Sequence, residues 1–564
     1  MEYCGNRAAG EQQQQQQQQQ RRFTITDLKH QAAEYYRSNE VPQRLEEVLN
    51  AMFYQRPEDF YGHLANYFSE LSKPPVITRL VGKKVLDGIG RPTLEVEVSC
   101  RVRNCVKRIC SSMISSHAEI LENASPEAID ADEREREESI KIAIEWINES
   151  LNEMFTGLQP TDQHKADELL GEYFAKKAEA DEERREAEKE KEKENQEAEA
   201  SGASAAPAPS GKKKPNKAAK KLSVLEKPIP PAEPAEPVVM GSMAIGCTSL
   251  AFAKTAATLR DMPLYLHIAL LKHDQESPKE LALPLPMATV LSCGKSSPGK
   301  LNLLKEVMVI PPHWLPVKQG VERCVDIQRE VMKLLSQTTN MPSSVGEGKK
   351  TSRDAAKKAP SKGKYEVILG TFKSPDEMVD VYVDLIRKFP SIMTLIDPLR
   401  KEDCQQWITL RNTLGSKCYI FAEELCKSVS KLMENHNTPK CSGLVLKYTN
   451  EAKISDLCKI TQLLDGRKRI SILGSPDGET SDDSLVDLAV GLRTRFIKLG
   501  GLSRGERVAK YNRLLAIEEE LGKNGRLGER EDHEFVDYTE EEEEEEEEEL
   551  ESTYITARTE RSAT

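Results

Sequence analysis

The sequence predicts an α/β protein whose C-terminal part is built from repeated strand-helix units. Short apolar runs rich in β-formers end at residues 396, 421, 447, 473 and 498, which are 25 or 26 residues apart. A loop and a helical stretch follow these runs, as in "VAKYNRLLAIEEEL" at residues 508–521. Repeated units of this kind are typical of a parallel sheet, either closed as a (β/α) barrel or doubly wound.

Charged residues stand where these runs end. Lys447 and Lys498 close two of the runs, and Asp397 and Glu423 follow two others. In a barrel the carboxyl ends of the strands meet around one mouth, so these side chains are expected to converge. Two lysines facing carboxylates indicate proton transfer or anion binding. The alternative is that they are surface charges at strand ends.

The sequence also predicts where the helix after Lys498 begins. Ser503 and Glu506 have the spacing of a capping box, so we expect the helix to begin directly after Ser503.

Composition limits the partners that can be expected. The 564 residues carry a net charge of -13, and the run at 540–549 alone contributes ten glutamates. The rest of the chain is close to neutral, so no nucleic acid is expected as a partner. Without a long apolar run or a basic-then-apolar leader, we expect no membrane contact and a cytoplasmic location.

Two amphipathic helices are predicted between residues 24 and 71, the first interrupted at Pro42 and the second starting after Pro57. So small a hairpin cannot bury its apolar faces alone, which predicts a homodimer. It resembles the dimerisation/docking helices of protein kinase A regulatory subunits and Dpy-30 proteins, at Val41-Pro42, Leu45, Arg56-Pro57, Asp59, Leu64-Ala65 and Tyr67-Phe68. That resemblance implies an anchoring-protein helix as a partner. An ordinary helical prefix is the alternative.

Four longer stretches resemble the enolase family. They are "VLDGIGRPTLEVEV" (85–98), "IEWINESLNEMFTGLQPTDQHKADELL" (144–170), "GSMAIGCTSLAFAKTAATLRDMPLYLHIA" (241–269) and "DLAVGLRTRFIKLGGLSRGERVAKYNRLLAIEEEL" (487–521). The resemblance is strongest to a divergent, sperm-associated branch. It implies an enolase-type (β/α) barrel with an α+β N-terminal capping domain, the glycolytic conversion of 2-phosphoglycerate to phosphoenolpyruvate, Mg²⁺, and a place in the sperm flagellum.

The resemblance also implies roles for single residues. Lys447 in "GLVLKYTN" matches the proton acceptor, and Lys498 in "FIKLGG" matches a second active-site lysine. Glu306 in "KEVMVIPP" matches a substrate-binding glutamate, and Glu423 in "FAEEL" matches a Mg²⁺ ligand, one methylene longer than the family's aspartate.

Six segments are expected on these grounds. They are a disordered Gln-rich arm (1–23), the helical hairpin (24–74), an enolase-like N-terminal domain (75–175), a charged and Pro/Ala/Lys-rich insert (176–240), the barrel (241–536) with a polar interval at 337–364, and a disordered acidic tail (537–564).

Other positions depart from the family pattern. Ile396 stands where the family has a metal-binding glutamate, and an alkyl group cannot ligate Mg²⁺. Pro476 replaces a phosphate-binding arginine, and Asp477 adds a negative charge beside it. The interval 312–364 is too short for all the barrel elements expected there, which leaves the completeness of the barrel open. Two functions therefore remain: a weakened 2-phosphoglycerate dehydratase, or a non-catalytic scaffold of the sperm flagellum anchored through its N-terminal helices.

Overall fold

The computed structural model describes residues 27–115, 126–202, 238–273, 276–292, 304–339, 365–368, 371–423, 432, 440–476 and 478–536. The chain divides into two compact units by its internal contacts. The first unit holds the chain up to Pro75 together with Val102–Cys105, and the second holds the remainder. We describe each unit by itself.

The N-terminal unit is helical. Residues 27–38 form a helix, and α2 (Val41–Gln55) and α3 (Phe60–Glu70) follow. The predicted interruption lies at Asn39–Glu40, where Glu40 has a φ of 56°, and Pro42 sits in the first turn of α2, where its missing N–H costs nothing. Asp59 caps α3 by accepting a hydrogen bond from the Gly62 N–H at 2.9 Å.

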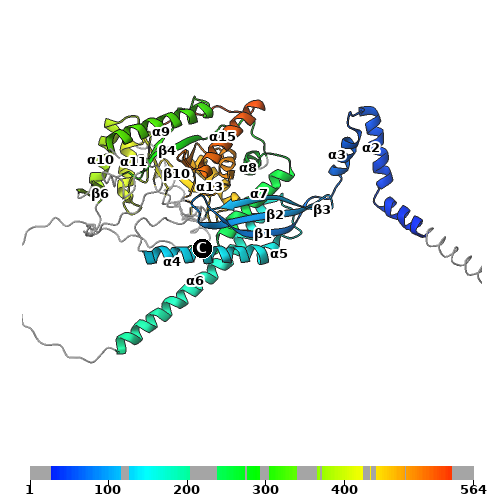
Figure 1. Ribbon diagram of the computed structural model, residues 1–564, viewed down its shortest axis with the longest axis horizontal. Helices are drawn as coiled ribbons and strands as arrows, with labels where there is room; N and C mark the ends of the chain where they lie inside the picture. The colour runs from blue at the N-terminus through cyan, green and yellow to red at the C-terminus, as the bar shows by residue number, and fades with distance from the viewer. Residues whose placement is uncertain are drawn as a thin grey trace, which may run out of the picture. The chain divides into compact units, whose positions relative to one another are not determined.

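In the second unit, three antiparallel strands form a sheet in the order β1 (Val76–Leu86), β2 (Pro92–Val102), β3 (Cys105–Ile114). Its edge strand β1 lies against helix α4 (Pro126–Trp146), the π-turn η1 (Ile147–Leu151) and α5 (Asn152–Phe155) (Figure 1). Two N–H groups of this edge donate to side-chain amides, Leu80 to Asn152 and Gly82 to Asn148. The helices thereby cover an edge that would otherwise be free to pair. Helix α6 (Gln163–Gly202) follows, and it extends into the insert expected at 176–240.

A second sheet has seven strands in the order β5-β4-β12-β11-β10-β9-β8. The strands are β4 (Leu285–Ser292), β5 (Glu306–Val309), β8 (Thr394–Ile396), β9 (Tyr419–Ala422), β10 (Gly443–Lys447), β11 (Ile470–Gly474) and β12 (Phe496–Gly500). All neighbours are parallel except β4 and β5. The predicted α/β class is confirmed, and the sheet is an open part of a barrel, because β5 and β8 end it without pairing with each other in the described residues.

Helices precede, separate and follow these strands along the chain. They are α7 (Met243–Leu259), α8 (Leu264–Lys272), α9 (Val317–Thr339), α10 (Pro375–Lys388), α11 (Cys404–Leu414), α13 (Ile454–Gly466), α14 (Ser484–Gly491) and α15 (Gly505–Lys523). A small hairpin, β6 (Tyr365–Ile368) and β7 (Thr371–Lys373), precedes α10. No helix in the described part of the chain is long and apolar enough to cross a bilayer.

The capping box expected at Ser503 is wrong. Helix α15 begins at Gly505, and its N-cap residue Arg504 makes no side-chain cap. Glu506 is not free to cap, because its side chain packs against Gly88 and lies 3.9 Å from the Arg504 guanidinium.

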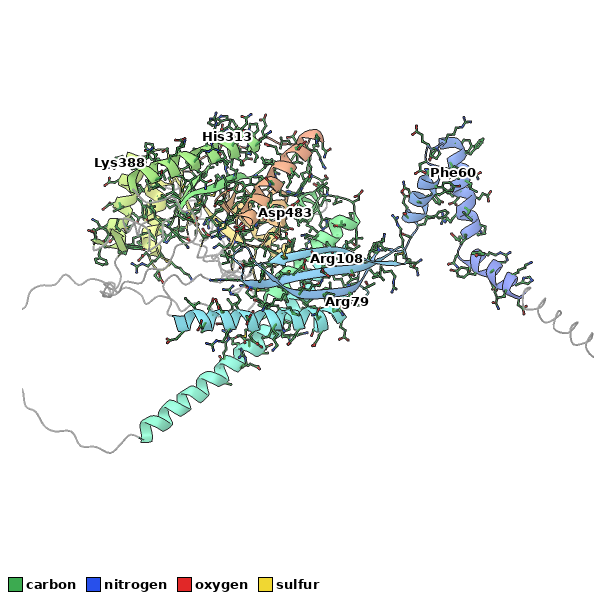
Figure 2. All side chains as sticks on the ribbon, viewed as in Figure 1. Phe60, Arg79, Arg108, His313, Lys388 and Asp483 are labelled. Carbon is green, nitrogen blue, oxygen red and sulfur yellow. The ribbon has the colours of Figure 1, made fainter. Side chains whose placement is uncertain are left out.

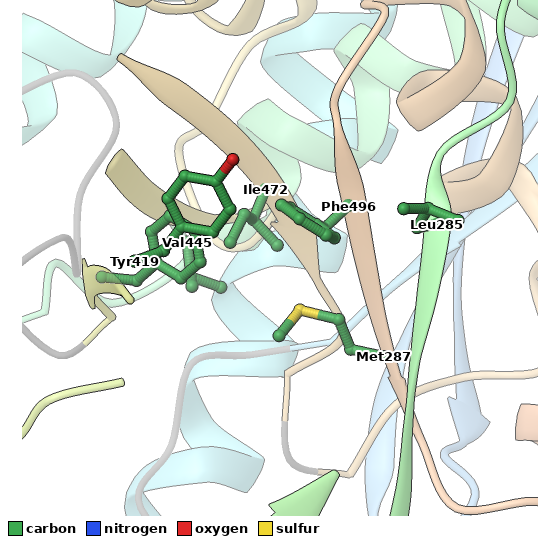
Figure 3. Close-up of a cluster of buried hydrophobic side chains, with 7 residues drawn as sticks. Leu285, Met287, Tyr419, Val445, Ile472 and Phe496 are labelled. Carbon is green, nitrogen blue, oxygen red and sulfur yellow. The ribbon is translucent and has the colours of Figure 1, made fainter. Parts of the chain in front are cut away.

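The inner face of the open barrel is apolar below the carboxyl ends of its parallel strands. Leu285, Phe496, Ile472 and Val445 are paired across neighbouring strands and therefore share one face at one level. With Met287, Tyr419 and Phe421 they form a buried cluster whose side chains point toward one another (Figure 3).

The segment after α15 packs at the amino ends of the strands. Arg530 donates to the carbonyl oxygens of Leu283, His313 and Leu315 at 2.8–3.0 Å. The Tyr419 hydroxyl donates to the Glu534 carbonyl at 2.9 Å, and the Phe535 ring lies 4.6 Å from the Tyr419 ring. This segment fills the side of the apolar cluster opposite the strands' carboxyl ends.

Candidate functional site

Two lysines lie in one layer above the apolar cluster. Lys447 of β10 and Lys498 of β12 are both paired in register with Gly474 of the intervening strand β11. Residues two apart on a strand share a face, so these three positions stand directly above Val445, Phe496 and Ile472 on the barrel's inner side. Gly474 has no side chain, and both ammonium groups can therefore reach the same space.

Glu423 enters that space from the neighbouring strand. It comes directly after β9, two residues beyond Phe421, which faces the apolar cluster. Its Oε1 lies 3.0 Å from the Lys447 Nζ, and its Oε2 lies 2.6 Å from the Lys498 Nζ. The three side chains are 10–16% exposed, so these are largely buried ion pairs.

Asp397 fixes the backbone that carries this carboxylate. Its Oδ1 accepts a hydrogen bond from the Glu423 N–H at 2.8 Å, and its own N–H donates to the Phe421 carbonyl at 3.0 Å. Asp397 has a φ of 47°, a left-handed conformation that aspartate tolerates better than most residues. Asp397 therefore positions Glu423.

Glu306 reaches the site because β5 is antiparallel to its neighbour β4. It is the first residue of β5 and is paired with Ser292, the last residue of β4, so it lies at the carboxyl end of the parallel strands. Its Oε2 lies 3.5 Å from the Lys498 Nζ. The structure thus brings together the four residues for which the sequence predicted site roles: Glu306, Glu423, Lys447 and Lys498.

The ion pairs set the charge state of the site. Burial would raise the pKa of Glu423, but the ammonium groups of Lys498 and Lys447 outweigh burial and lower the pKa from 4.5 to about 2. Burial likewise opposes the charge on Lys498, yet Glu423 and Glu306 raise the pKa of that lysine above its ordinary value. At neutral pH Glu423 is therefore an anion and Lys498 a cation.

Two buried hydroxyls next to these strands lack a hydrogen-bond partner among the described residues. They are the hydroxyls of Thr289 and Ser475. Thr289 lies on β4, beside β12, and Ser475 follows Gly474. Buried polar groups are normally paired, so these atoms favour a site that takes a polar ligand.

The residues present do not fit a Mg²⁺ ion. Mg²⁺ prefers six oxygen ligands in octahedral geometry, and both oxygens of Glu423 are already held by lysines. Ile396 lies level with Phe421 and packs against the apolar cluster. The described residues contain no group of three or more His, Cys, Asp or Glu side chains arranged to hold a metal ion.

The described residues at the position expected to bind phosphate offer no free cation. Pro476 lines a cavity of about 40 Å³ together with Tyr448, Glu479 and Lys510. The Lys510 Nζ lies 2.7 Å from the Glu479 carboxylate, so its charge is already paired. Asp477 lies outside the described residues.

Sequence reasoning missed Gly474, Thr289 and Ser475. A signal for Gly474 was present, since it stands two residues after Ile472 just as the lysines stand two residues after Val445 and Phe496. Thr289 and Ser475 carried no such signal, because only the three-dimensional structure shows whether a hydroxyl finds a partner.

A barrel sheet with one antiparallel neighbour, an antiparallel N-terminal sheet and a lysine-carboxylate site at the strand ends define an enolase-type protein. A family model for the enolase C-terminal TIM barrel domain matches residues 362–534. The chain belongs to the enolase family.

Individual enolases resemble the chain to different degrees. Enolase 4 of Homo sapiens is 48% identical over an alignment of 571 positions, gaps included, that covers 91% of this chain and 91% of its own. Enolase 4 of Mus musculus is 47% identical and covers 91% of this chain and 92% of its own. Cytosolic enolase 3 of Arabidopsis thaliana is 23% identical and covers 87% of this chain and 96% of its own.

Proposed function

We propose that this chain binds 2-phosphoglycerate in the barrel mouth and dehydrates it slowly to phosphoenolpyruvate in the cytoplasm. The observation that supports this most is the paired layer of Lys447 and Lys498 around Gly474. Two ammonium groups on a buried inner face suit a small carboxylate- and phosphate-bearing ligand, and the unpartnered hydroxyls of Thr289 and Ser475 would contact it.

The proposed roles follow from charge and position. Lys447 takes the proton from the carbon next to the carboxylate, and Lys498 neutralises the negative charge that then builds up on the carboxylate. The electron pair forms the carbon-carbon double bond as the hydroxyl leaves and becomes water. Glu306 binds the substrate, and the residue that protonates the leaving hydroxyl is unassigned.

The same geometry makes the reaction slow. The Lys447 side chain is paired with Glu423 at 3.0 Å, so the substrate must separate this pair before Lys447 can act on it. The family uses Mg²⁺, but no ligand set for it is present in the described residues, so we derive no step through a metal. Pro476 replaces the expected phosphate-binding arginine. Each tenfold loss corresponds to about 1.4 kcal/mol of barrier, and such losses multiply.

A second function is favoured by the N-terminal unit. Tyr54 and Tyr61 are 84% and 81% exposed, and Phe53 is also exposed. So is Phe60, which is labelled in Figure 2. Aromatic surface of this extent is typical of a protein interface. The corresponding function is a scaffold of the sperm flagellum, in which this unit forms a homodimer and binds an anchoring-protein helix.

Turnover of 2-phosphoglycerate separates the two functions. We expect weak formation of phosphoenolpyruvate by the full chain, visible at high protein concentration by its ultraviolet absorbance. Lys447→Ala should abolish it, because no other base is placed at that position. If the full chain and Lys447→Ala give the same background, the dehydratase function is wrong and the scaffold function replaces it.

A further inference from the structure

Each carboxylate oxygen of Glu423 is held by a different lysine. Lys447 takes Oε1 and Lys498 takes Oε2, and the hydrogen bond from Glu423 N–H to Asp397 holds the backbone between them. A divalent cation at this carboxylate would have to displace an ammonium group and would meet the electrostatic repulsion of both lysines.

The residues around Glu423 complete this arrangement. The alkyl group of Ile396 packs into the apolar cluster below, and Glu306 pairs with Lys498 from β5. Both glutamates therefore have an ammonium partner without any further ion. Removing one member of a buried ion pair leaves the other charge uncompensated.

We infer that Lys447 and Lys498 supply to Glu423 the positive charge that Mg²⁺ supplies elsewhere in the family, so the site binds its anionic ligand without a metal. The ligand enters by displacing Glu423 from the two lysines. The identity of that ligand, 2-phosphoglycerate, rests on the proposed function, whereas the replacement of the cation rests on the ion pairs alone.

The inference and a metal site at Glu423 predict opposite effects of Glu423→Gln on the binding of 2-phosphoglycerate. In Glu423→Gln the amide keeps the shape of the side chain but loses its charge, so the lysines are left free for an anion. Calorimetry of the full chain in EDTA should then show 2-phosphoglycerate binding that is tighter than wild type on the order of tenfold, because one like charge is gone. Glu529→Gln, an exposed residue outside the site, makes the same change in net charge and should bind like wild type. Weaker binding by Glu423→Gln, or binding by the wild type only when Mg²⁺ is added, would overturn the inference.

A second measurement does not depend on the ligand. Mn²⁺ binding followed by water-proton relaxation should be the same for wild type, Glu423→Gln and Glu529→Gln, since Glu423 is occupied by lysines. The acidic run at 540–549 is present in all three chains and cancels in the comparison. A stoichiometric Mn²⁺ site lost only in Glu423→Gln would refute the inference. If no chain binds 2-phosphoglycerate, the proposed function fails, and the Mn²⁺ comparison alone decides the inference.

Discussion

Glu423 is the residue on which the electrostatics of the site depend. Its folded-state pKa of about 2 lies below its ordinary 4.5, so its ionisation stabilises the fold above pH 4.5. At about 1.4 kcal/mol per pKa unit, the stabilisation is about 3 kcal/mol. We expect this part to be lost as the pH falls from 4.5 toward 2. Denaturant titrations between pH 4.5 and 2 should show that the free energy of unfolding falls less for Glu423→Gln than for wild type. An equal fall with pH in both proteins would contradict the lowered pKa of Glu423.

At the level of single residues, the sequence predicted much of the site. The regular spacing of the strands placed Lys447, Lys498 and Glu423 at one mouth, because buried parallel strands end on the same side. Glu306 came from family resemblance alone, since its place depends on β5 running antiparallel. The pairing of Glu423 with two lysines was not predictable, because it depends on strand register and on the hydrogen bond that the Glu423 N–H donates to Asp397.

Among the elements, the strands were easier to predict than the start of a helix. The apolar runs predicted the strands β8 to β12, because a strand that is buried on both faces of a sheet is hydrophobic along its whole length. The capping box failed because Glu506 packs against Gly88, a contact between segments far apart in sequence. Local signals predict local structure only where no distant segment competes for the same side chain.

The segment after α15 gives a prediction at this scale. A chain ending after Gly528 loses the three hydrogen bonds of Arg530 and the packing of Phe535 on Tyr419. We expect its free energy of unfolding to fall by several kcal/mol, since partly buried carbonyl groups lose their donor and the apolar cluster is exposed. A chain ending after Val536 keeps these contacts and is the matched control. Equal denaturation midpoints for the two truncated chains would show that the segment is not structural.

For the whole molecule, the exposed aromatic residues of the N-terminal unit predict self-association. We expect the full chain to sediment as a dimer and a chain lacking residues 1–71 to sediment as a monomer, because the apolar surface of α2 and α3 needs a partner. Tyr54→Ser together with Tyr61→Ser in the full chain should weaken the dimer without altering the second unit. A dimer that survives the deletion would place the interface elsewhere.

The central claim is that Glu423 is bound by lysines, and a double-mutant cycle tests it most directly. The free energies of unfolding are measured for wild type, Glu423→Gln, Lys498→Met and the double variant. The Glu423–Lys498 pair is buried, with 2.6 Å between its charged atoms, so removing either partner leaves the other charge unpaired. We expect the losses of unfolding free energy in the two single variants to add up to about 1–3 kcal/mol more than the loss in the double variant. Additive effects, with a coupling near zero, would contradict the claim.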